Sequence, residues 1–169
     1  QVYGPLPTRM LPLATVISRQ ILPLKGNIHL MRLDGGWSDR VSVLTALPLS
    51  SELCPVFVGL SFTNVERLIP RLGDLQETPW PLEHILRAGY GLVVAHYNDF
   101  APDDAKQFAA SLEKRGLSSN HRAISVWAAG LMELRALAEQ LEGVDPNRIY
   151  AIGHSRLGKT ALWAAANDL

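Results

Sequence analysis

Polar and apolar residues alternate over two short segments in the first third of the chain. The alternation is partial over residues 27–33 and regular over residues 41–47, with an Asp-Gly-Gly turn sequence at 34–36 between them. A period of two is typical of strands that expose one face, and Asp-Gly sequences favour tight turns. These segments predict an antiparallel pair of strands.

Three later segments are short, unbroken apolar runs, at residues 56–60, 91–95 and 148–152. Runs of this kind are typical of strands that are buried on both faces of a parallel sheet. The connections between them are long enough to return the chain for parallel pairing. The sequence therefore predicts an α/β sheet with an antiparallel start, in which reactive groups gather at the carboxyl ends of the parallel strands.

Helices are predicted between these strands. Residues 81–88 begin with a proline and end before Gly89, and residues 121–141 place apolar side chains at steps of three and four. Residues 99–120 are polar and mixed, which predicts a loop with a short helix. Residues 161–166 are expected to begin a helix that continues to the last residue without a stop signal.

Length and composition indicate one domain. The 169 residues are 47% apolar and 19% charged, and 16 basic side chains balance 16 acidic ones. A chain without net charge offers no field for nucleic acid or for an anionic membrane. We expect residues 1–26, rich in Leu and Pro, to form an extended N-terminal arm, and residues 27–169 to form the N-terminal part of a single α/β domain of a longer protein.

Several classes of site and segment are not supported by the sequence. Cys54, the one cysteine, excludes an internal disulfide and a multi-thiolate metal site. No apolar stretch has the roughly 18 residues of a transmembrane helix, and no signal peptide is evident. We expect no cofactor, no metal and no membrane partner, and the sequence leaves the oligomeric state open.

The segment Gly153–Thr160, Gly-His-Ser-Arg-Leu-Gly-Lys-Thr, follows a predicted buried strand and precedes a predicted helix. It matches the phosphate-binding pattern G-x-x-x-x-G-K-[ST], in which Lys159 would bind phosphates and Thr160 would bind Mg²⁺. Bulky residues inside the loop and the late position of the segment in the strand order disfavour a P-loop nucleotide hydrolase.

The alternative hypothesis is a nucleophile elbow, a sharp strand-to-helix turn that exposes the hydroxyl of Ser155. Gly153 stands two residues before the serine, as this turn requires, but Leu157 stands where the second glycine is usual and Gly158 follows it. The generic pattern therefore fails by one residue, and the motif by itself leaves both hypotheses open.

The wider segment G-H-S-R-L-G-K resembles the serine motif G-[CH]-S-R-x-G-K of the glucuronoyl esterases, carbohydrate esterase family 15. The resemblance extends to three upstream segments and covers about residues 27–169. These segments lie at residues 56–62 (V-F-V-G-L-S-F), 89–103 (from G-Y-G to H-Y-N-D-F-A-P-D) and 123–131 (A-I-S-V-W-A-A-G-L). A departure occurs at residues 61–65, where the family's Asn-Phe-Arg-Gly-Asn-His loop is altered.

This resemblance implies a secreted or periplasmic α/β-hydrolase that cleaves glucuronoyl esters of glucuronoxylan in lignocellulose. Ser155 would be the nucleophile, Arg156 would contact the oxyanion through its N–H and guanidinium, and Lys159 would bind sugar hydroxyls. The order Ser, acid, His of this fold places the acid and the histidine beyond residue 169. The fragment alone would then be inactive, and a degenerate or truncated hydrolase without activity remains an alternative.

The other polar and aromatic candidates have simpler explanations. We expect the scattered histidines 29, 84, 96 and 121 to be surface or satisfied side chains, and Trp127, Trp163 and Cys54 to pack in the core. Asp99 and the pair Asp103-Asp104 follow a strand's carboxyl end, which allows either a role in the site or turn and helix-cap chemistry.

Overall fold

The computed structural model describes residues 3–7, 13–22, 26–34, 40–50, 52–69 and 80–168. Residues 35 and 36 of the predicted turn, and residues 1–2, 8–12 and 23–25 of the predicted arm, lie outside them. The described chain holds a six-stranded sheet in the order β1-β2-β3-β5-β4-β6. The strands are β1 (Leu13–Leu22), β2 (Gly26–Asp34), β3 (Val41–Pro48), β4 (Cys54–Ser61), β5 (Gly91–His96) and β6 (Val144–Ile152).

The sheet is mixed, as the sequence predicts. β1, β2, β3 and β5 pair antiparallel, whereas β4 pairs parallel with both β5 and β6. The β4–β6 pairing is irregular between Cys54 and Val56. The turn sequence Asp145-Pro146-Asn147 lies in this irregularity, and the N–H of Asn147 donates to Oδ1 of Asp145 at 2.9 Å.

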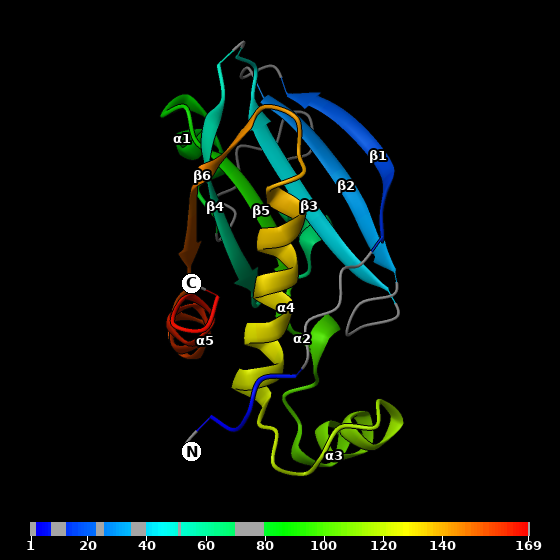
Figure 1. The fold of residues 1–169 in the computed structure, drawn as a ribbon. Coiled ribbons are helices and arrows are strands. Elements are labelled where there is room, and N and C mark those ends of the chain that lie inside the picture. Colours follow the sequence, from blue (N-terminus) through cyan, green and yellow to red (C-terminus); the bar gives the residue numbers. More distant parts are fainter. Residues whose placement is uncertain are drawn as a thin grey trace.

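Helices cover both faces of the sheet. Figure 1 shows α4 along one face with α5 beside it, next to β6, and α1 on the other face. The helical elements are η1 (Val65–Leu68), α1 (Leu82–Arg87), α2 (Tyr97–Phe100), α3 (Ala105–Lys114), α4 (Ala123–Ala138) and α5 (Arg156–Ala165). The α/β-hydrolase-like architecture expected from the sequence is confirmed.

The central strand β5 is buried on both faces, which explains its unbroken apolar sequence. Val93 and Ala95 pack in a core cluster with α4 and α5, whereas Leu92 and Val94 pack in a second cluster with α1 and η1. Side chains alternate across a strand, so consecutive apolar residues are needed to fill both layers.

Residues 99–120 contain the predicted short helix, α3. Three expectations need correction. Leu13–Leu22, predicted as part of an extended arm, is strand β1 of the same sheet, because this stretch between Pro12 and Pro23 has free backbone N–H groups to pair with β2. Residues 148–152, predicted as a strand buried on both faces, belong to the edge strand β6, where Tyr150 and Ile152 are exposed. Helix α5 ends at Ala165 and does not continue to the last residue, and the side chain of Asn167 donates to the carbonyl of Trp163 at 2.7 Å.

None of the helices in the described part of the chain is both long and apolar enough to cross a membrane.

Candidate active site

Three parallel strands end at the same edge of the sheet. β4 runs into Phe62, β5 into Tyr97 and β6 into the turn that carries Ser155. The segments that follow the carboxyl ends of the parallel strands therefore lie at one edge of the sheet, although they are far apart in sequence.

Ser155 lies in a strained backbone conformation between β6 and α5. Its φ is 55° and its ψ is −125°, and no other non-glycine residue among those described has a positive φ. A side chain in this region costs on the order of 1–3 kcal/mol and persists only where the surroundings enforce it. The residue is exposed and helix α5 begins directly after it. This is the geometry of a nucleophile elbow.

Two glycines make the sharp turn possible. A Cβ on Gly153 would lie 2.5 Å from the carbonyl carbon of Leu157, and a Cβ on Gly158 would lie 3.1 Å from the carbonyl oxygen of Gly153. Gly158 thus provides the clearance against the strand that the generic pattern assigns to a glycine one position earlier. The spacing that fails the motif in sequence is satisfied in space.

The P-loop hypothesis is wrong for this segment. In a P-loop the backbone N–H groups converge on a phosphate, whereas here those of Leu157, Gly158 and Lys159 donate to the carbonyls of residues 154 and 155. The Thr160 side chain is buried, and its hydroxyl donates to the carbonyl of Arg156 at 3.0 Å. A hydroxyl in this position faces its own helix and not a Mg²⁺ ion.

The guanidinium of Arg156, which follows β6, is held by side chains that follow the other two parallel strands, β4 and β5. Its Nη1 lies 2.6 Å from Oδ2 of Asp103. Its central carbon lies 5.3 Å from the ring centroid of Phe62 and 5.9 Å from that of Tyr97, within the range of cation–π interaction. A fixed cation thus lies next in sequence to the exposed hydroxyl of Ser155.

Lys159 lies one helical turn beyond Ser155, and its N–H donates to the Ser155 carbonyl at 3.2 Å. Its side chain is exposed and has no acidic partner in the part of the chain that the structure describes. His154, on the same turn, is also exposed. No histidine among the described residues is hydrogen-bonded to the Ser155 hydroxyl.

The two adjacent aspartates after β5 have different roles. Asp104 caps helix α3, where its Oδ1 accepts from the N–H groups of Lys106 at 3.0 Å and Gln107 at 2.9 Å. Asp103 forms the ion pair with Arg156. The sequence allowed either a helix cap or a role near the strand ends for both aspartates. In the structure Asp104 is the helix cap, and Asp103 pairs with a cation near the strand ends.

Asp99 lies in α2, just before the loop that carries Asp103, and Nδ1 of His96 is 3.5 Å from the Asp99 carboxylate. Burial raises the pKa of the Asp99 carboxyl, and the neighbouring His96 offsets this effect in part. The described residues contain no group of three or more potential metal ligands.

The expected core residues pack as predicted. Trp127 is buried and its Nε1 donates to the carbonyl of Ala101 at 2.9 Å. Trp163 is partly buried against the same core, and Cys54 is buried in it. Burial raises the pKa of the Cys54 thiol, which makes it a poor nucleophile.

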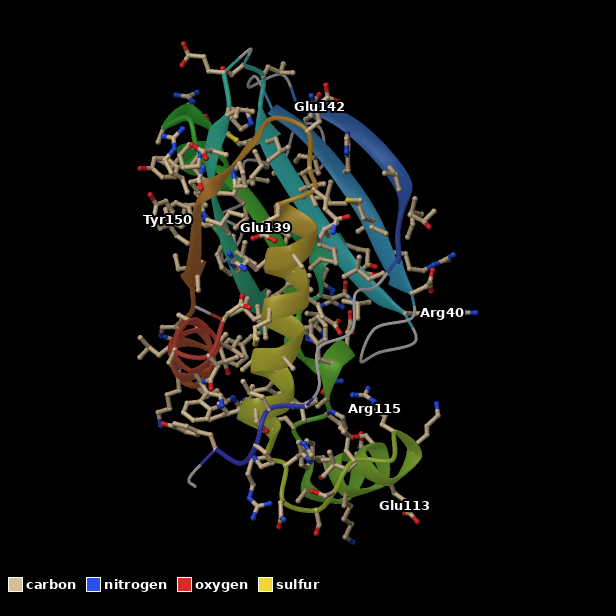
Figure 2. The ribbon with its side chains drawn as sticks, in the orientation of Figure 1. Arg40, Glu113, Arg115, Glu139, Glu142 and Tyr150 are labelled. Atoms are coloured by element: carbon tan, nitrogen blue, oxygen red, sulfur yellow. The ribbon has the colours of Figure 1, made fainter. Side chains whose placement is uncertain are left out.

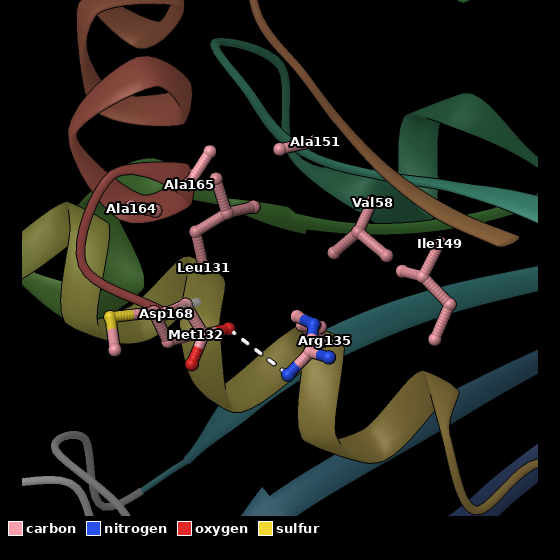
Figure 3. A pocket seen from close by; sticks show the side chains of 9 residues that line it. All are labelled: Val58, Leu131, Met132, Arg135, Ile149, Ala151, Ala164, Ala165 and Asp168. Carbon is pink, nitrogen blue, oxygen red and sulfur yellow. Dashed lines mark hydrogen bonds and ion pairs between the residues drawn. The ribbon is translucent and has the colours of Figure 1, made fainter. Parts of the chain in front are cut away.

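Two hollows lie apart from the elbow. A small one of about 120 Å³ lies among α4, α5, β4 and β6, where Nη1 of Arg135 is 3.3 Å from Oδ2 of Asp168 (Figure 3). A larger one of about 760 Å³ lies by the end of β3 and the start of β6. Neither of these two hollows is lined by Ser155, Arg156 or Lys159, and the side chains of these three residues are exposed.

Comparison with known proteins finds similar carbohydrate esterases. No family model matches the chain. The carbohydrate esterase MZ0003, from an unknown prokaryotic organism, is 31% identical over 96 residues, which cover 53% of this chain and 22% of that protein.

Among solved structures, a glucuronoyl esterase from Solibacter usitatus is 27% identical, with a TM-score of 0.80, over 98% of this chain and 52% of that one. A family 15 glucuronoyl esterase from Teredinibacter turnerae shares the fold, with a TM-score of 0.77 at 21% identity, over 98% of this chain and 45% of that one. The chain therefore spans about half the length of these esterases. In sequence and structure it is similar to carbohydrate esterases, and the predicted resemblance to the glucuronoyl esterases of carbohydrate esterase family 15 is confirmed.

Proposed function

We propose that the protein is a serine carbohydrate esterase that cleaves glucuronoyl esters of glucuronoxylan through an acyl-enzyme on Ser155. The observation that carries the proposal is the strained, exposed Ser155 at the start of α5, with the Arg156 cation beside it. A strained conformation that the fold maintains at a strand end is typical of a functional site.

In the first step, the Ser155 hydroxyl attacks the ester carbonyl while a general base takes its proton. The carbonyl oxygen becomes negative. The backbone N–H of Arg156, at the positive end of the α5 dipole, and the Arg156 guanidinium are both suited to stabilise that charge. When the intermediate collapses, the alcohol leaves with a proton, and water then hydrolyses the ester on Ser155.

The substrate assignment follows from the relatives and from the surface around Ser155. A neutral ester needs no counter-ion, but its transition state is anionic, which suits the neighbouring cation. Lys159, exposed on the same end of α5, is assigned to hydrogen bonds with sugar hydroxyls. Because polymeric xylan does not cross a membrane, we assign the enzyme to the periplasm or the cell exterior.

The general base and its orienting carboxylate are assigned to the part of the esterase that this chain does not span. The chain spans about half the length of its structural relatives, and none of its described histidines is hydrogen-bonded to the Ser155 hydroxyl. Without that base the serine would remain a weak nucleophile, because a hydroxyl needs an adjacent base for activation. Activity is therefore expected only from the full-length protein.

The test uses the full-length protein encoded by the gene that contains this sequence. A fluorophosphonate probe should label Ser155, identified by peptide mapping, and the protein should release alcohol from a benzyl ester of glucuronic acid. Ser155→Ala should abolish both, whereas Ser118→Ala, at an exposed serine between α3 and α4, should change neither.

Two results would contradict the proposal. Labelling that persists in Ser155→Ala would remove the nucleophile assignment. Hydrolysis of acetylated xylan without hydrolysis of the glucuronate ester would remove the substrate assignment while retaining the serine chemistry.

A further inference from the structure

The ion pair between Asp103 and Arg156 joins the elbow to a residue outside it. We propose that Asp103 is a positioning residue, which holds the Arg156 guanidinium next to Ser155 for stabilisation of the oxyanion. This inference rests on the function proposed above. It concerns a residue from the loop between α2 and α3, far in sequence from the serine motif.

Three side chains confine the guanidinium of Arg156. Nη1 of Arg156 lies 2.6 Å from Oδ2 of Asp103, a short charge-assisted contact. The rings of Phe62 and Tyr97, whose centroids are 5.4 Å apart, lie against the same guanidinium. The carboxylate supplies direction, since a ring attracts a cation without fixing its orientation.

The Tyr97 ring is held by the buried core. Its ring packs edge to face on the ring of the buried Trp127, with centroids 5.1 Å apart. The aromatic support of Arg156 is therefore continuous with the core under α4. A cation on such a support keeps its place without rearrangement during the reaction, which is the condition for effective electrostatic stabilisation.

The segment that carries Asp103 is fixed at both ends. On one side, the Arg115 guanidinium donates to the carbonyl of Phe100 and the Trp127 indole donates to that of Ala101. Figure 2 shows the Arg115 side chain next to α2. On the other side, Asp104 begins helix α3 with two bonds from backbone N–H groups.

Close packing under the loop adds to this rigidity. The ring of Phe100 lies directly over Gly130 of α4, where a Cβ would overlap it. The main chain that presents Asp103 is therefore anchored to α4 by packing as well as by hydrogen bonds. A carboxylate on such a segment can direct a flexible arginine.

The exposure of the Asp103–Arg156 ion pair allows an effect on catalysis to be distinguished from an effect on folding stability. The side chains of Arg156 and Asp103 are 46% and 32% exposed. Ion pairs this accessible to water contribute little to folding. Loss of the Asp103 charge should therefore leave the protein folded, and its effect should be on the reaction.

The experiment is a double-mutant cycle in the full-length esterase, with Asp103→Asn, Arg156→Ala and the double variant. Asp103→Asn should lower kcat on the glucuronate ester by about tenfold, with less than about a threefold change in KM. In the Arg156→Ala background the same substitution should change kcat by less than about twofold, because residues that act through one another are not additive.

Two further variants complete the design. Asp103→Glu keeps the charge and should restore kcat to within about threefold of the wild type. Asp104→Asn removes a charge one residue away while it retains a good helix cap, so its kcat should stay within about twofold of the wild type. Melting temperatures of all variants should lie within a few degrees of one another.

Each result separates the two proposals. Equal effects of Asp103→Asn in the two backgrounds would overturn the positioning role, as would an equal loss in Asp104→Asn. Both results leave the serine mechanism intact if Ser155→Ala is inactive. A full-length protein without activity on the ester, or activity that survives Ser155→Ala, would overturn the proposed function and the positioning role together.

Discussion

The backbone of Leu157 occupies the space that a side chain on Gly153 would need. A Cβ at Gly153 would lie 2.5 Å from the Leu157 carbonyl carbon and 2.8 Å from the nitrogen of Gly158. Both obstacles are main-chain atoms, which cannot rotate away. The chain can enter α5 directly after β6 only because residue 153 has no side chain.

Gly153→Ala should therefore open the turn and displace Ser155. We expect a loss of about 1–3 kcal/mol in the free energy of unfolding, measured by urea denaturation, and a strong loss of labelling by a fluorophosphonate probe. Gly158→Ala is the matched control, since its Cβ would be 3.1 Å from one carbonyl oxygen and should cost less. Equal effects of the two substitutions would contradict this account of the turn.

The strain at Ser155 predicts that its removal stabilises the protein. At a φ of 55° and a ψ of −125°, glycine is unstrained while alanine carries the same cost as serine. Ser155→Gly should therefore have a free energy of unfolding about 1 kcal/mol greater than that of Ser155→Ala, and a higher melting temperature, although both variants lack the nucleophile. A comparison by calorimetry checks this. An alanine variant at least as stable as the glycine variant would show that residue 155 is not strained.

The position of the Thr160 hydroxyl predicts a small effect of its removal. Because this hydroxyl donates to the Arg156 carbonyl within α5, Thr160→Val should retain ester hydrolysis within about threefold and lose at most about 1.5 kcal/mol of stability. Magnesium and ATP should not raise the melting temperature of the wild type or of the variant. A rise in the wild type that Thr160→Val abolishes would restore the nucleotide-binding hypothesis.

Asp99 should lower the free energy of unfolding as the pH rises from the pKa of this carboxyl in the unfolded chain to its pKa in the folded protein. Burial raises the pKa of this carboxyl in the folded state above the ordinary value of about 3.9. Between these two values the folded state holds a proton that the unfolded chain has released, so the free energy of unfolding decreases with pH. Asp99→Asn, neutral at every pH, should remove this decrease in urea denaturation series between pH 3 and 8.

His96→Leu is the companion variant for Asp99. His96 lowers the pKa of the Asp99 carboxyl through its charge and a hydrogen bond, so its removal should extend the falling interval to higher pH. If Asp99→Asn and the wild type showed parallel stability profiles over the whole range, burial of Asp99 would not control its titration.

Much of the fold follows from local patterns. The unbroken apolar runs predict β4 and β5 because these strands are covered on both faces, and the alternating segments predict β2 and β3. The run at 148–152 predicts a strand as well, but β6 lies at the edge of the sheet, where Tyr150 and Ile152 are exposed. Strand β1 escaped prediction because its apolar sequence lies among the prolines of the first 26 residues, which favour an extended arm, and only its pairing with β2 places it in the sheet. The short helix expected within residues 99–120 is confirmed as α3, although most of its residues face water.

The serine motif belongs to the part that the sequence alone determines. The elbow at Ser155 is built from consecutive residues, and its φ, its flanking glycines and the start of α5 are all properties of a short stretch of chain. The motif still matched two patterns. Backbone conformation separated them, because the same letters can wrap around an anion or turn sharply into a helix.

The surroundings of Ser155 were decided only by the tertiary structure. Phe62, Tyr97 and Asp103 approach Arg156 because β4, β5 and β6 are neighbours in the sheet and run parallel, so their carboxyl ends meet. Adjacent aspartates with the same local sequence took different partners for this reason. Strand order is a property of the whole packed chain, and no residue near Asp103 encodes which cation will lie opposite it.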